Sequence, residues 1–544
     1  MMEDNKMNCF TRIKRSLFRM HNKSALGLIF LLTIFPISCA TLGPDFKTPE
    51  SPISEEWSGS EGLIVNNKTS DYSQWWEVFN DPILNNLIDK AAQQNLSLQI
   101  AGLRILEARA VLGIAIGNQY PQSQNLSGGY AVTEASENVP PYSNDSSIDT
   151  TTRIGSLGFS AAWEMDFWGK FRRSVESADA DLASTLASYD DLLVMLTSEV
   201  ASTYMTIQTI KQRIEYANYN ILIQQRGLDI ARANFEGGRT TELDVQQALS
   251  LLLNTKALIP ELKINLRQAK NGLSILLGIP AGELKDYLDE ASIMPDIPAD
   301  VAIGIPADLI RRRPDIRHSE LQVASQGALI GVAQADLYPH FAIAGSVGFA
   351  ADDKSLLDSD NILGAFIPFS FKWDLFNYGR IKNNIRAQDA RFQQVVVNYQ
   401  NKVLEAVKEV EDGLIGFLRS QTREKYLADA EKASLRATDL SLLHYKEGLS
   451  DYTRVLNSQQ VLVEQQDSLV RTHGDVARYL IAVYKALGGG WQVKAGEDLV
   501  PATTIEIMKT RTDWGNLLDS VSHPEEPQVP KTGKEVDLFK KPVW

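Results

Sequence analysis

Two long stretches of the chain carry the pattern of uninterrupted α-helix, and they constrain the fold more than any other feature. In the first, Arg173–Glu236, the residues of one face recur in alternating steps of three and four, which is the spacing of a heptad packing seam. The second, Asn383–Lys446, is equally long, and each stretch is followed by a tight turn and a return helix. An α-helix rises about 1.5 Å per residue, so each would extend roughly 96 Å, farther than one globular core. The sequence therefore predicts one elongated body.

The two halves of the chain repeat each other. Residues around and after the long helices match at a separation of 210 positions: the pairs are Trp163 with Trp373, Gly169 with Gly379, Lys170 with Arg380, Gly238 with Gly448, Val245 with Val455, and Leu277-Gly278 with Leu487-Gly488. Upstream residues match at a separation of 218 positions: the pairs are Leu103 with Leu321, Gly113 with Gly331, and Tyr120-Pro121 with Tyr338-Pro339. Such constant separations indicate a duplicated unit. The change in separation places a longer loop in the first half.

Within each unit the sequence predicts the order helix, strand, loop, strand, long helix, turn and return helix. The first helices are expected at Pro82–Gly117 and Asp308–Leu337, because each ends before a Tyr-Pro pair and proline cannot continue a helix. The strands are expected at 121–133, 153–167, 339–350 and 363–376. Apolar residues alternate along them. In the last strand the residues predicted to share one face are Ile367, Phe369, Phe371, Trp373 and Leu375.

Alternation of this kind occurs both in half-buried sheets of soluble proteins and in membrane-spanning strands. Here each strand is about ten residues long with aromatic residues near its ends, as a tilted membrane-spanning strand requires. The connecting loops, Thr133–Thr152 and Ala350–Ile362, are polar. We therefore favour the membrane interpretation. Unpaired backbone groups at an open sheet edge cost several kcal/mol in lipid, so four strands per chain require several copies to close a barrel. A dimer would supply eight strands and a trimer twelve.

The first forty residues have the layout of a secretory signal. Basic residues precede an apolar run, Ala25–Ile37, that is too short to span a bilayer comfortably. The run ends at Pro36-Ile37-Ser38-Cys39, which resembles the bacterial lipobox except that Pro36 replaces the usual leucine. We predict cleavage after residue 38 and lipidation of Cys39. An ordinary signal peptide with an incidental cysteine is the alternative. Ala40 is not the acidic residue associated with inner-membrane retention, which points to the outer membrane.

The charge balance excludes one class of partner. The full chain has a formal net charge of −14. Removing residues 1–38 takes away six basic and two acidic residues, which leaves 48 basic and 66 acidic residues and a net charge of −18. Nucleic acid is not expected to bind such a surface. Cys39 would be the single cysteine of the mature chain, so no internal disulfide is expected.

Several motifs together resemble the outer membrane factors of Gram-negative export machines, the TolC/OprM/NodT group. The motifs are Leu309-Ile310-Arg311-Arg312-Arg313-Pro314-Asp315-Ile316-Arg317, Ile330-Gly331-Val332-Ala333, Trp373-Asp374-Leu375-Phe376, Trp163-Glu164-Met165-Asp166, Glu242-Leu243-Asp244-Val245 and Leu276-Leu277-Gly278. The resemblance covers roughly Gly43–Trp491 and is closest to the lipidated branch that serves drug efflux. It implies an α+β membrane protein: a homotrimer with a twelve-stranded β-barrel that continues into a long α-helical periplasmic tunnel.

The duplication and the resemblance together suggest a division of the chain. The expected segments are a lipoprotein signal peptide at 1–38, a lipid-anchored equatorial segment at 39–80, the first repeat at 81–278, an equatorial linker at 279–307, the second repeat at 308–490 and a C-terminal equatorial segment at 491–544. The charged, proline-containing stretch after Asp513 is expected to be disordered.

Functional residues are expected at the two turns that follow the long helices. By the resemblance, these turns dock a periplasmic adaptor protein and lie beside the closed gate of the tunnel. The docking residues are Gly237, Gly238, Arg239, Gly448, Leu449 and Ser450. The gate residues are Asp244, Asp451, Arg454 and Asn457, although family members commonly carry Asp near the last two positions.

Two of the gate residues have structural alternatives. Asp244 completes a capping box with Thr241, and both roles stay open. Asp451 could equally be a helix-start charge that interacts with the helix dipole. A ring of three such carboxylates in a narrow pore would still concentrate negative potential.

The leading functional prediction is a passive exit duct in the outer membrane for drugs or other small molecules. An inner-membrane RND pump would drive it through the adaptor, and the family's opening route is an iris-like untwisting of the inner helices. The first alternative is protein export with an ABC transporter. The second is a non-conducting lipoprotein that tethers the envelope, which would leave the four alternating strands without a purpose.

Catalytic patterns are not evident in the sequence. The six histidines are scattered without metal-ligand spacing, and Gly488-Gly489-Gly490 lacks the Lys-Ser/Thr of a phosphate loop. Arg311-Arg312-Arg313 could suggest a nucleic-acid patch, but it opens a helix in an acidic exported chain, so we expect it to be structural. We predict neither an enzyme nor a cofactor.

Overall fold

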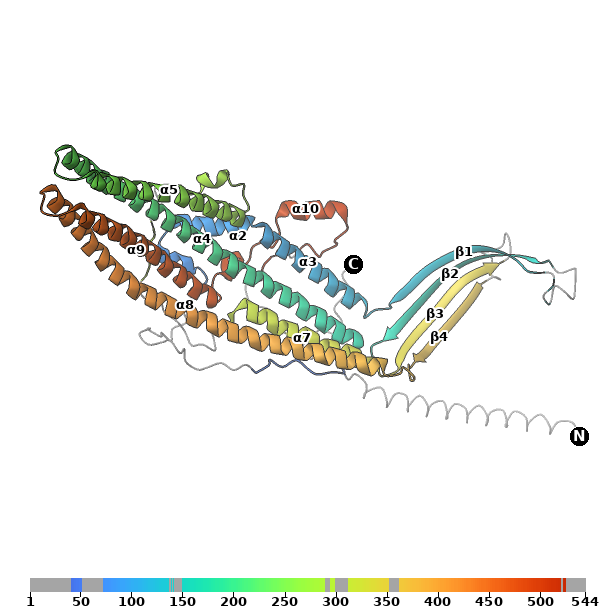
Figure 1. Cartoon of the computed structure of the whole chain (residues 1–544). Coiled ribbons are helices and arrows are strands. Elements are labelled where there is room, and N and C mark those ends of the chain that lie inside the picture. The colour runs from blue at the N-terminus through green and yellow to red at the C-terminus, as the bar shows by residue number, and fades with distance from the viewer. Residues whose placement is uncertain are drawn as a thin grey trace, which may run out of the picture.

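The computed structural model describes residues 41–50, 72–136, 138, 140, 149–288, 294–298, 312–351, 362–519 and 522–524. The chain is elongated, with a helical body that ends in two hairpins and a four-stranded sheet that extends from the other end (Figure 1). Its helices are η2 (Trp75–Phe79), α2 (Pro82–Gln94), α3 (Leu96–Gly117), α4 (Lys170–Glu236), α5 (Glu242–Leu277), η4 (Glu283–Asp286), α7 (Pro314–Ala335), α8 (Arg380–Lys446), α9 (Tyr452–Ala486), η7 (Trp491–Lys494) and α10 (Ala502–Arg511). Its strands are β1 (Ser123–Glu134), β2 (Thr151–Met165), β3 (His340–Ala351) and β4 (Ile362–Lys372).

The two long helices are confirmed, and both are slightly longer than predicted. α4 and α8 each contain 67 residues. Each begins directly after a glycine in the left-handed region, Gly169 at φ 75° and Gly379 at φ 81°. In the first repeat the carboxylate of Asp166 accepts from the backbone N–H groups of Phe171 and Arg172, at 3.1 and 2.9 Å. These bonds satisfy donors that the start of a helix leaves unpaired.

The duplication is visible in the backbone. The glycines that end the long helices, Gly238 and Gly448, have φ of 66° and 76°, and those that end the return helices, Gly278 and Gly488, have 70° and 72°. A helix commonly ends on such a left-handed residue, and glycine adopts it without steric cost.

The order of the helices follows the order of the strands. Figure 1 shows α3, α4, α7 and α8 side by side along the body, and β1 to β4 follow in the same sequence beyond them. α3 and β1 therefore lie at one edge of the chain, and α8 and β4 at the other. Each repeat contributes two neighbouring helices and two neighbouring strands.

The prediction of one helix at Pro82–Gly117 is wrong, because the chain breaks it at Asn95. This residue has an extended backbone (ψ 124°) and separates α2 from α3. Its side-chain oxygen accepts from the Leu98 N–H at 2.9 Å, and its amide donates to the Leu276 carbonyl at 2.9 Å. The break therefore fixes the end of α5 against the start of α3. In the second repeat α7 begins at Pro314, and Asp308 lies outside the described residues.

The four strands form one antiparallel sheet in the order β1-β2-β3-β4. Phe159 pairs with Leu126 on one side and with Val347 on the other, so the apolar sets of the first three strands share a face. The prediction that Ile367 shares a face with Phe371 is wrong. A bulge between β3 and β4 pairs Ile367 with Ala344, whereas Phe371 pairs with Phe341, and an extra residue in a strand moves the side chains beyond it to the opposite face. β4 also ends at Lys372, before the predicted position 376.

The main hydrophobic core lies at the middle of the body. Trp75 and Trp76 of η2 are 2% exposed, and Trp75 stacks on Tyr484 of α9 with ring centroids 5.4 Å apart. His523 also lies here, 2% exposed, with its Nε2 2.6 Å from the Asp190 carboxylate of α4. The prediction of disorder after Asp513 is therefore wrong for residues 514–519 and 522–524.

Arg313 connects three elements in the same region. It is 7% exposed, bonds both carboxylate oxygens of Asp315 at 3.0 and 2.9 Å, donates to the Ala486 carbonyl at 2.7 Å and reaches Glu409 of α8 at 2.7 Å. Its neighbour Arg312 is exposed. The structural interpretation of this basic cluster is confirmed for Arg313, and Arg311 lies outside the described residues.

The N-terminal segment 41–50 lies across the junction between the two repeats. The carbonyl of Leu42 accepts from Nε of Arg173 at 2.9 Å, and this arginine is 1% exposed. Gly331 of α7 lies under the segment, because a Cβ on Gly331 would lie 2.3 Å from the Leu42 carbonyl oxygen.

Replacing Gly331 with alanine is expected to displace this segment. The new Cβ cannot coexist with the Leu42 carbonyl, and overpacking of this kind costs about 1–3 kcal/mol. Limited proteolysis should then cut within residues 41–50 faster than in the unmodified protein. Gly272→Ala is the control, because a Cβ on this helical glycine of α5 meets nothing within 4 Å. Equal cleavage rates in the two variants would contradict the prediction.

Candidate functional site

The two hairpins end in matching turns. After α4, the N–H groups of Gly237 and Arg239 donate to the Ala233 and Asn234 carbonyls, at 3.0 and 2.8 Å. After α8, the N–H groups of Glu447 and Leu449 donate to the Leu443 and His444 carbonyls, at 3.0 and 2.8 Å. Five of the six residues predicted for docking are exposed and Ser450 is half-buried; Leu449 is 74% exposed. The turns therefore present backbone, the charged Arg239 and the apolar Leu449 to the surroundings.

A separate apolar cluster, which we name the tip core, joins the two hairpins behind these turns. Its buried members are Leu228, Ala231, Ala248, Leu252, Tyr445, Tyr452 and Val455. They come from α4, α5, α8 and α9, so the tip core holds the ends of both repeats together. Tyr445 and Tyr452 meet edge to face with ring centroids 5.1 Å apart.

Asp244 contacts the opposite hairpin. The hydroxyl of Tyr445 donates to Oδ2 of Asp244 at 3.0 Å. The predicted capping box is wrong, because Thr241 is the N-cap of α5 but makes no side-chain capping bond. Most buried side-chain hydroxyls have a hydrogen-bond partner, and the carboxylate that accepts from Tyr445 comes from the first turn of α5. Asp244 therefore links α5 to α8.

The hydroxyls of the two tyrosines in the tip core stay protonated at ordinary pH, because the pKa of each is raised. Burial raises the pKa of Tyr445, and the Asp244 carboxylate raises it further. Burial also raises the pKa of Tyr452, with smaller contributions from Tyr445 and Asp244. Their hydroxyls have different surroundings: that of Tyr452 has no hydrogen-bond partner within the described residues.

The remaining predicted gate residues lie on the outside of α9. Asp451 is its N-cap and accepts from the Arg454 N–H at 3.3 Å, so the helix-start role of Asp451 is confirmed. Asp451, Arg454 and Asn457 are exposed. Within one chain the structure thus brings Asp244 to Tyr445, a residue that the sequence analysis missed. The sequence feature that could have indicated this contact is the pair of tyrosines, Tyr445 and Tyr452, on either side of the second turn.

Farther from the tips, polar residues line the seam where α4 meets α9. Gln224 and Gln459 are 2% and 1% exposed, and their side chains have no hydrogen-bond partner among the residues described. Asn220 donates to Gln466 at 2.8 Å, and Nε of Arg213 lies 2.6 Å from Asp467. Buried polar groups without partners destabilise an interface, so this seam is weaker than an apolar one.

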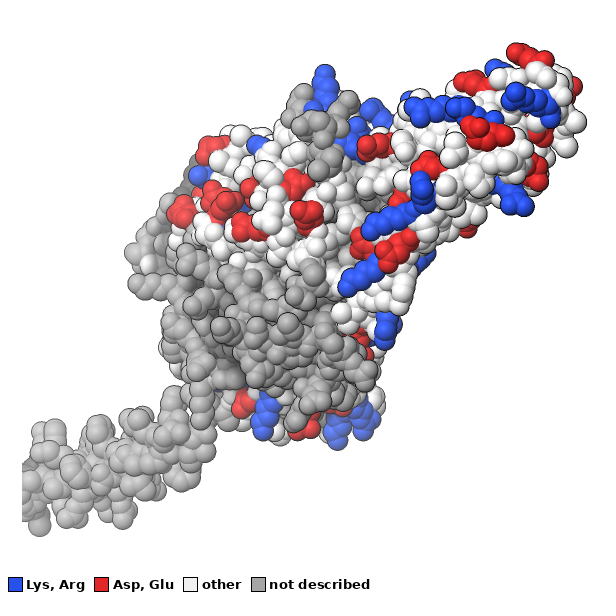
Figure 2. Space-filling model, turned by 90° about the vertical axis from the view of Figure 1, so that its left-hand side faces the viewer, with Lys and Arg blue, Asp and Glu red and all other residues white. Residues whose placement is uncertain are grey.

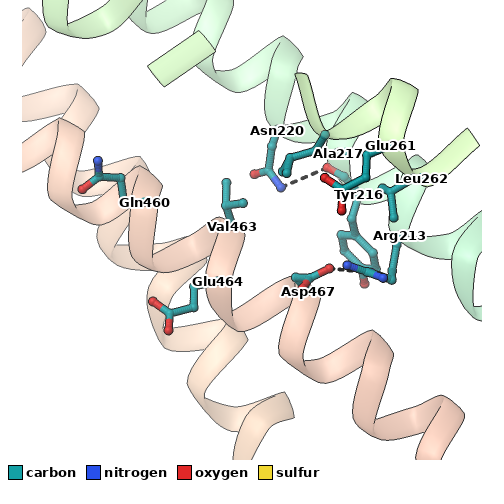
Figure 3. Close-up of a pocket in the computed structure, with 11 residues that line it drawn as sticks. Arg213, Tyr216, Ala217, Asn220, Glu261, Leu262, Gln460, Val463, Glu464 and Asp467 are labelled. Atoms are coloured by element: carbon teal, nitrogen blue, oxygen red, sulfur yellow. Dashed lines mark hydrogen bonds and ion pairs between the residues drawn. The ribbon is translucent and has the colours of Figure 1, made fainter. Parts of the chain in front are cut away.

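A pocket of about 210 Å³ opens along this seam between α4, α5 and α9 (Figure 3). Arg213 and Asp467 face each other at one end of it, and Glu261 and Glu464 lie on opposite sides. Its charged side chains are of both signs. In the part of the chain that the structure describes, no group of three or more His, Cys, Asp and Glu side chains could hold a metal ion.

The described surface toward the hairpin tips carries acidic and basic side chains interspersed, without a large patch of one sign (Figure 2). No described helix combines the length and the apolar character needed to cross a membrane. The described site residues are therefore suited to contacts between helices and to contacts at the turns.

Comparison with known proteins gives the same architecture. The sequence matches the family described as outer membrane efflux protein over residues 87–279 and 305–489, the two repeats. Nodulation protein T of Rhizobium leguminosarum bv. viciae is 30% identical over 459 residues, which cover 84% of this chain and 92% of that protein. The solvent efflux pump outer membrane protein SrpC of Pseudomonas putida is 28% identical over 474 residues, 85% of this chain and 98% of that one.

Among solved structures, the outer-membrane channel OprN superposes with a TM-score of 0.77 at 28% identity, covering 83% of this chain and 100% of that one. The predicted fold class is confirmed, with four strands per chain that continue into a long helical body, and so is the predicted outer membrane location. The names of SrpC and OprN describe an efflux pump outer membrane protein and an outer-membrane channel. The chain belongs to the outer membrane efflux protein family.

Proposed function

We propose that the chain is the exit duct of a tripartite efflux system, driven by an inner-membrane RND pump through a periplasmic adaptor, and that its cargo is drugs or other small molecules. One observation carries the proposal. The exposed turns lie at the end of helices of 67 residues, which at 1.5 Å per residue extend about 100 Å. The sheet at the other end has the strand pattern of a membrane barrel. A duct with these ends would bridge the outer membrane and most of the periplasm.

The duct would be a homotrimer. β1 and β4 are the outer strands of a four-stranded sheet, and in lipid both edges must be paired. Three copies would close a twelve-stranded barrel. Side chains on the sheet, such as Leu126 at 74% and Phe366 at 73% exposure, would then contact outer membrane lipid.

The gate would lie at the tip core. The bond from Tyr445 to Asp244 joins the two hairpins of one chain, and the polar seam behind it lowers the cost of separating α4 from α9. In a trimer, Asp451, Arg454 and Asn457 would face the pore or a neighbouring copy at the same level. Opening would separate the hairpins there, while the core at the middle of the body stays packed.

Lipidation of Cys39 belongs to the same proposal. Cys39 lies outside the described residues, but the described chain resumes at Thr41, which packs against Gly169 at the base of the sheet. An acyl chain on Cys39 would start close to the membrane-facing strands. The segment boundaries at 38, 80, 278, 307 and 490 are proposed with it.

Protein export with an ABC transporter is the second candidate, because the same channel architecture could work with an RND pump or with an ABC transporter. Small-molecule efflux is favoured by the relative SrpC, whose name specifies a solvent efflux pump. An envelope tether that conducts nothing is the third candidate.

Covalent capture in living cells would distinguish these candidates. A photo-crosslinker at Leu449, 74% exposed in the second turn, is expected to trap an adaptor protein, with an RND pump copurifying. A crosslinker at Ile507 of α10, 58% exposed and far from the turns, is the control. Trapping of an ABC transporter complex would move the function to protein export. Trapping of neither class at Leu449 would contradict the tripartite assignment.

A further inference from the structure

The pocket along the seam between α4, α5 and α9 has both apolar and charged walls (Figure 3). Its apolar residues come from all three helices: Ala217 from α4, Leu258 and Leu262 from α5, and Val463 from α9. Its volume of about 210 Å³ corresponds to about seven water molecules at roughly 30 Å³ each. The pocket therefore has room for a short alkyl chain with one polar head.

The charged residues of the pocket leave an excess of negative charge. Asp467 is already neutralised, because Nε of Arg213 lies 2.6 Å from one of its oxygens and Arg471 lies 2.8 Å from the other. Glu261 and Glu464 also line the pocket, and neither forms an ion pair with any described residue. Unpaired carboxylates in a partly enclosed site attract cations.

A buried amide provides a further acceptor. Asn220 lines the pocket and is 3% exposed. Its Nδ2 donates to the Tyr216 carbonyl at 2.9 Å and to Oε1 of Gln466 at 2.8 Å. Both bonds use the nitrogen, and Oδ1 accepts no hydrogen bond in the part of the chain that the structure describes. A ligand that donates hydrogen bonds would therefore satisfy a buried oxygen that is costly to leave unpaired.

The pocket lies beside the most weakly held part of α5. The buried residues of this helix, all of which the structure describes, form one group near the tip and one at the far end, with Leu262 alone between them. Pro260 lies in the same middle stretch, and a proline inside a helix removes a backbone hydrogen bond. Its counterpart in the second repeat, at the separation of 210 positions, is Val470, which is buried in α9.

We propose that this pocket binds a small organic cation, a primary alkylammonium ion. Its ammonium group would donate to the Glu261 carboxylate and to Oδ1 of Asn220, and its alkyl chain would pack on Leu262 and Val463. A bound cation would fasten the middle of α5 to α4 and α9. The site itself does not depend on the proposed function, but an effect of the ligand on channel opening rests on it.

The chemistry of the pocket favours this class of ligand over others. An ammonium group has three hydrogen-bond donors and no acceptor, and the free polar groups of Glu261 and Asn220 are acceptors. An anion would meet these carboxylates, because the guanidinium of Arg213 already binds Asp467. A metal ion is disfavoured, since no group of three or more His, Cys, Asp and Glu side chains could hold one in the described parts of the chain. The apolar wall fits the alkyl chain.

Calorimetric titration of the purified full-length protein in detergent with n-hexylammonium chloride tests the site. Saturable binding of one cation per chain is expected. Glu261→Gln should weaken it about tenfold or more, the value of a hydrogen bond to a charged group. Glu261 is exposed, so the variant should fold normally. Hexan-1-ol, which has the same chain without the charge, should bind at least about tenfold more weakly than hexylammonium.

The matched control is Glu215→Gln. It makes the same change of charge at an exposed position of α4 that does not line the pocket, and it should bind hexylammonium as the unmodified protein does. Equal affinities of the unmodified protein and Glu261→Gln would overturn the proposal. Equal affinities of hexylammonium and hexan-1-ol would also overturn it.

Amide hydrogen exchange locates the ligand independently of the affinity. Hexylammonium should slow exchange at residues 256–264 of α5 in the unmodified protein and in Glu215→Gln, because the bound cation fastens this stretch to its neighbours. It should have no such effect in Glu261→Gln. Binding without slower exchange at these residues would place the ligand elsewhere and overturn the proposed site.

Conductance separates the site from the proposed function. In Tyr445→Phe, a variant designed to open the channel, hexylammonium should lower the conductance, because opening separates the helices that the cation joins. The effect should vanish in Tyr445→Phe/Glu261→Gln, which distinguishes it from direct block of the pore. Binding that requires Glu261 but leaves the conductance unchanged would support the site and contradict the proposed opening along this seam.

Discussion

Replacing Arg313 with alanine is expected to lower the free energy of unfolding by about 3–5 kcal/mol, the cost of removing one partner from a buried ion pair. The guanidinium is 8% exposed as a side chain and binds Asp315 through two oxygens. Burial alone would lower its pKa, but Asp315 and Glu409 outweigh burial and raise it. Without Arg313, the carboxylate of Asp315 and the carbonyl of Ala486 at the end of α9 lose their main partner together.

The measurement is the midpoint of thermal unfolding, followed by the helical circular dichroism signal of the purified protein in detergent. Arg312→Ala is the control, since this neighbouring arginine is exposed and surface substitutions usually change stability by less than about 0.5 kcal/mol. Arg313→Lys should fall between the two, because lysine keeps the charge but cannot make the two-pronged contact. Equal midpoints for Arg313→Ala and Arg312→Ala would show that the contacts of Arg313 do not stabilise the helical body.

The parts of the fold that the sequence predicted depend on local patterns or on the duplication. The long helices have an uninterrupted period, and the turns at Gly238 and Gly448 need a residue that adopts positive φ. The repeat then allowed every such feature to be checked twice in one chain.

The parts that the sequence missed depend on contacts between distant residues. Asn95 breaks a helix because it bonds Leu276, 181 positions away. His523 is buried because Asp190, 333 positions earlier, lies beside it. The bulge that turns Ile367 to the other face is a property of two strands together. No periodicity within a single segment contains this information.

The candidate gate also depends on a contact between residues far apart in the sequence. The sequence indicated Asp244 but offered a capping role for it, and Thr241 was the obvious local partner. In the folded chain the carboxylate bonds Tyr445, 201 positions away. A gate that joins two repeats depends on pairs of this kind, and they become visible when the hairpins are seen together.

Replacing Tyr445 with phenylalanine is expected to open the channel. The substitution keeps the ring in the tip core and its edge-to-face contact with Tyr452, and it removes the hydroxyl that bonds Asp244. A hydrogen bond to a charged group contributes about 1.5–3 kcal/mol, which corresponds to roughly a 10- to 100-fold change in the ratio of open to closed states in each subunit. Conductance of the reconstituted protein across a planar bilayer measures this ratio.

The neighbouring tyrosine provides the control. Tyr452 is 1% exposed and Tyr445 is 2% exposed, but the hydroxyl of Tyr452 has no hydrogen-bond partner within the described residues. Tyr452→Phe therefore removes the same atom from the same cluster without breaking a link between hairpins, and it should leave the conductance low. If both variants conduct equally, the loss of a polar atom from the tip core matters and the link does not. If Tyr452→Phe alone opens the channel, the bond from Tyr445 to Asp244 does not hold the gate closed. Opening by Tyr445→Phe alone would locate the gate at the hydrogen bond from Tyr445 of α8 to Asp244 of α5.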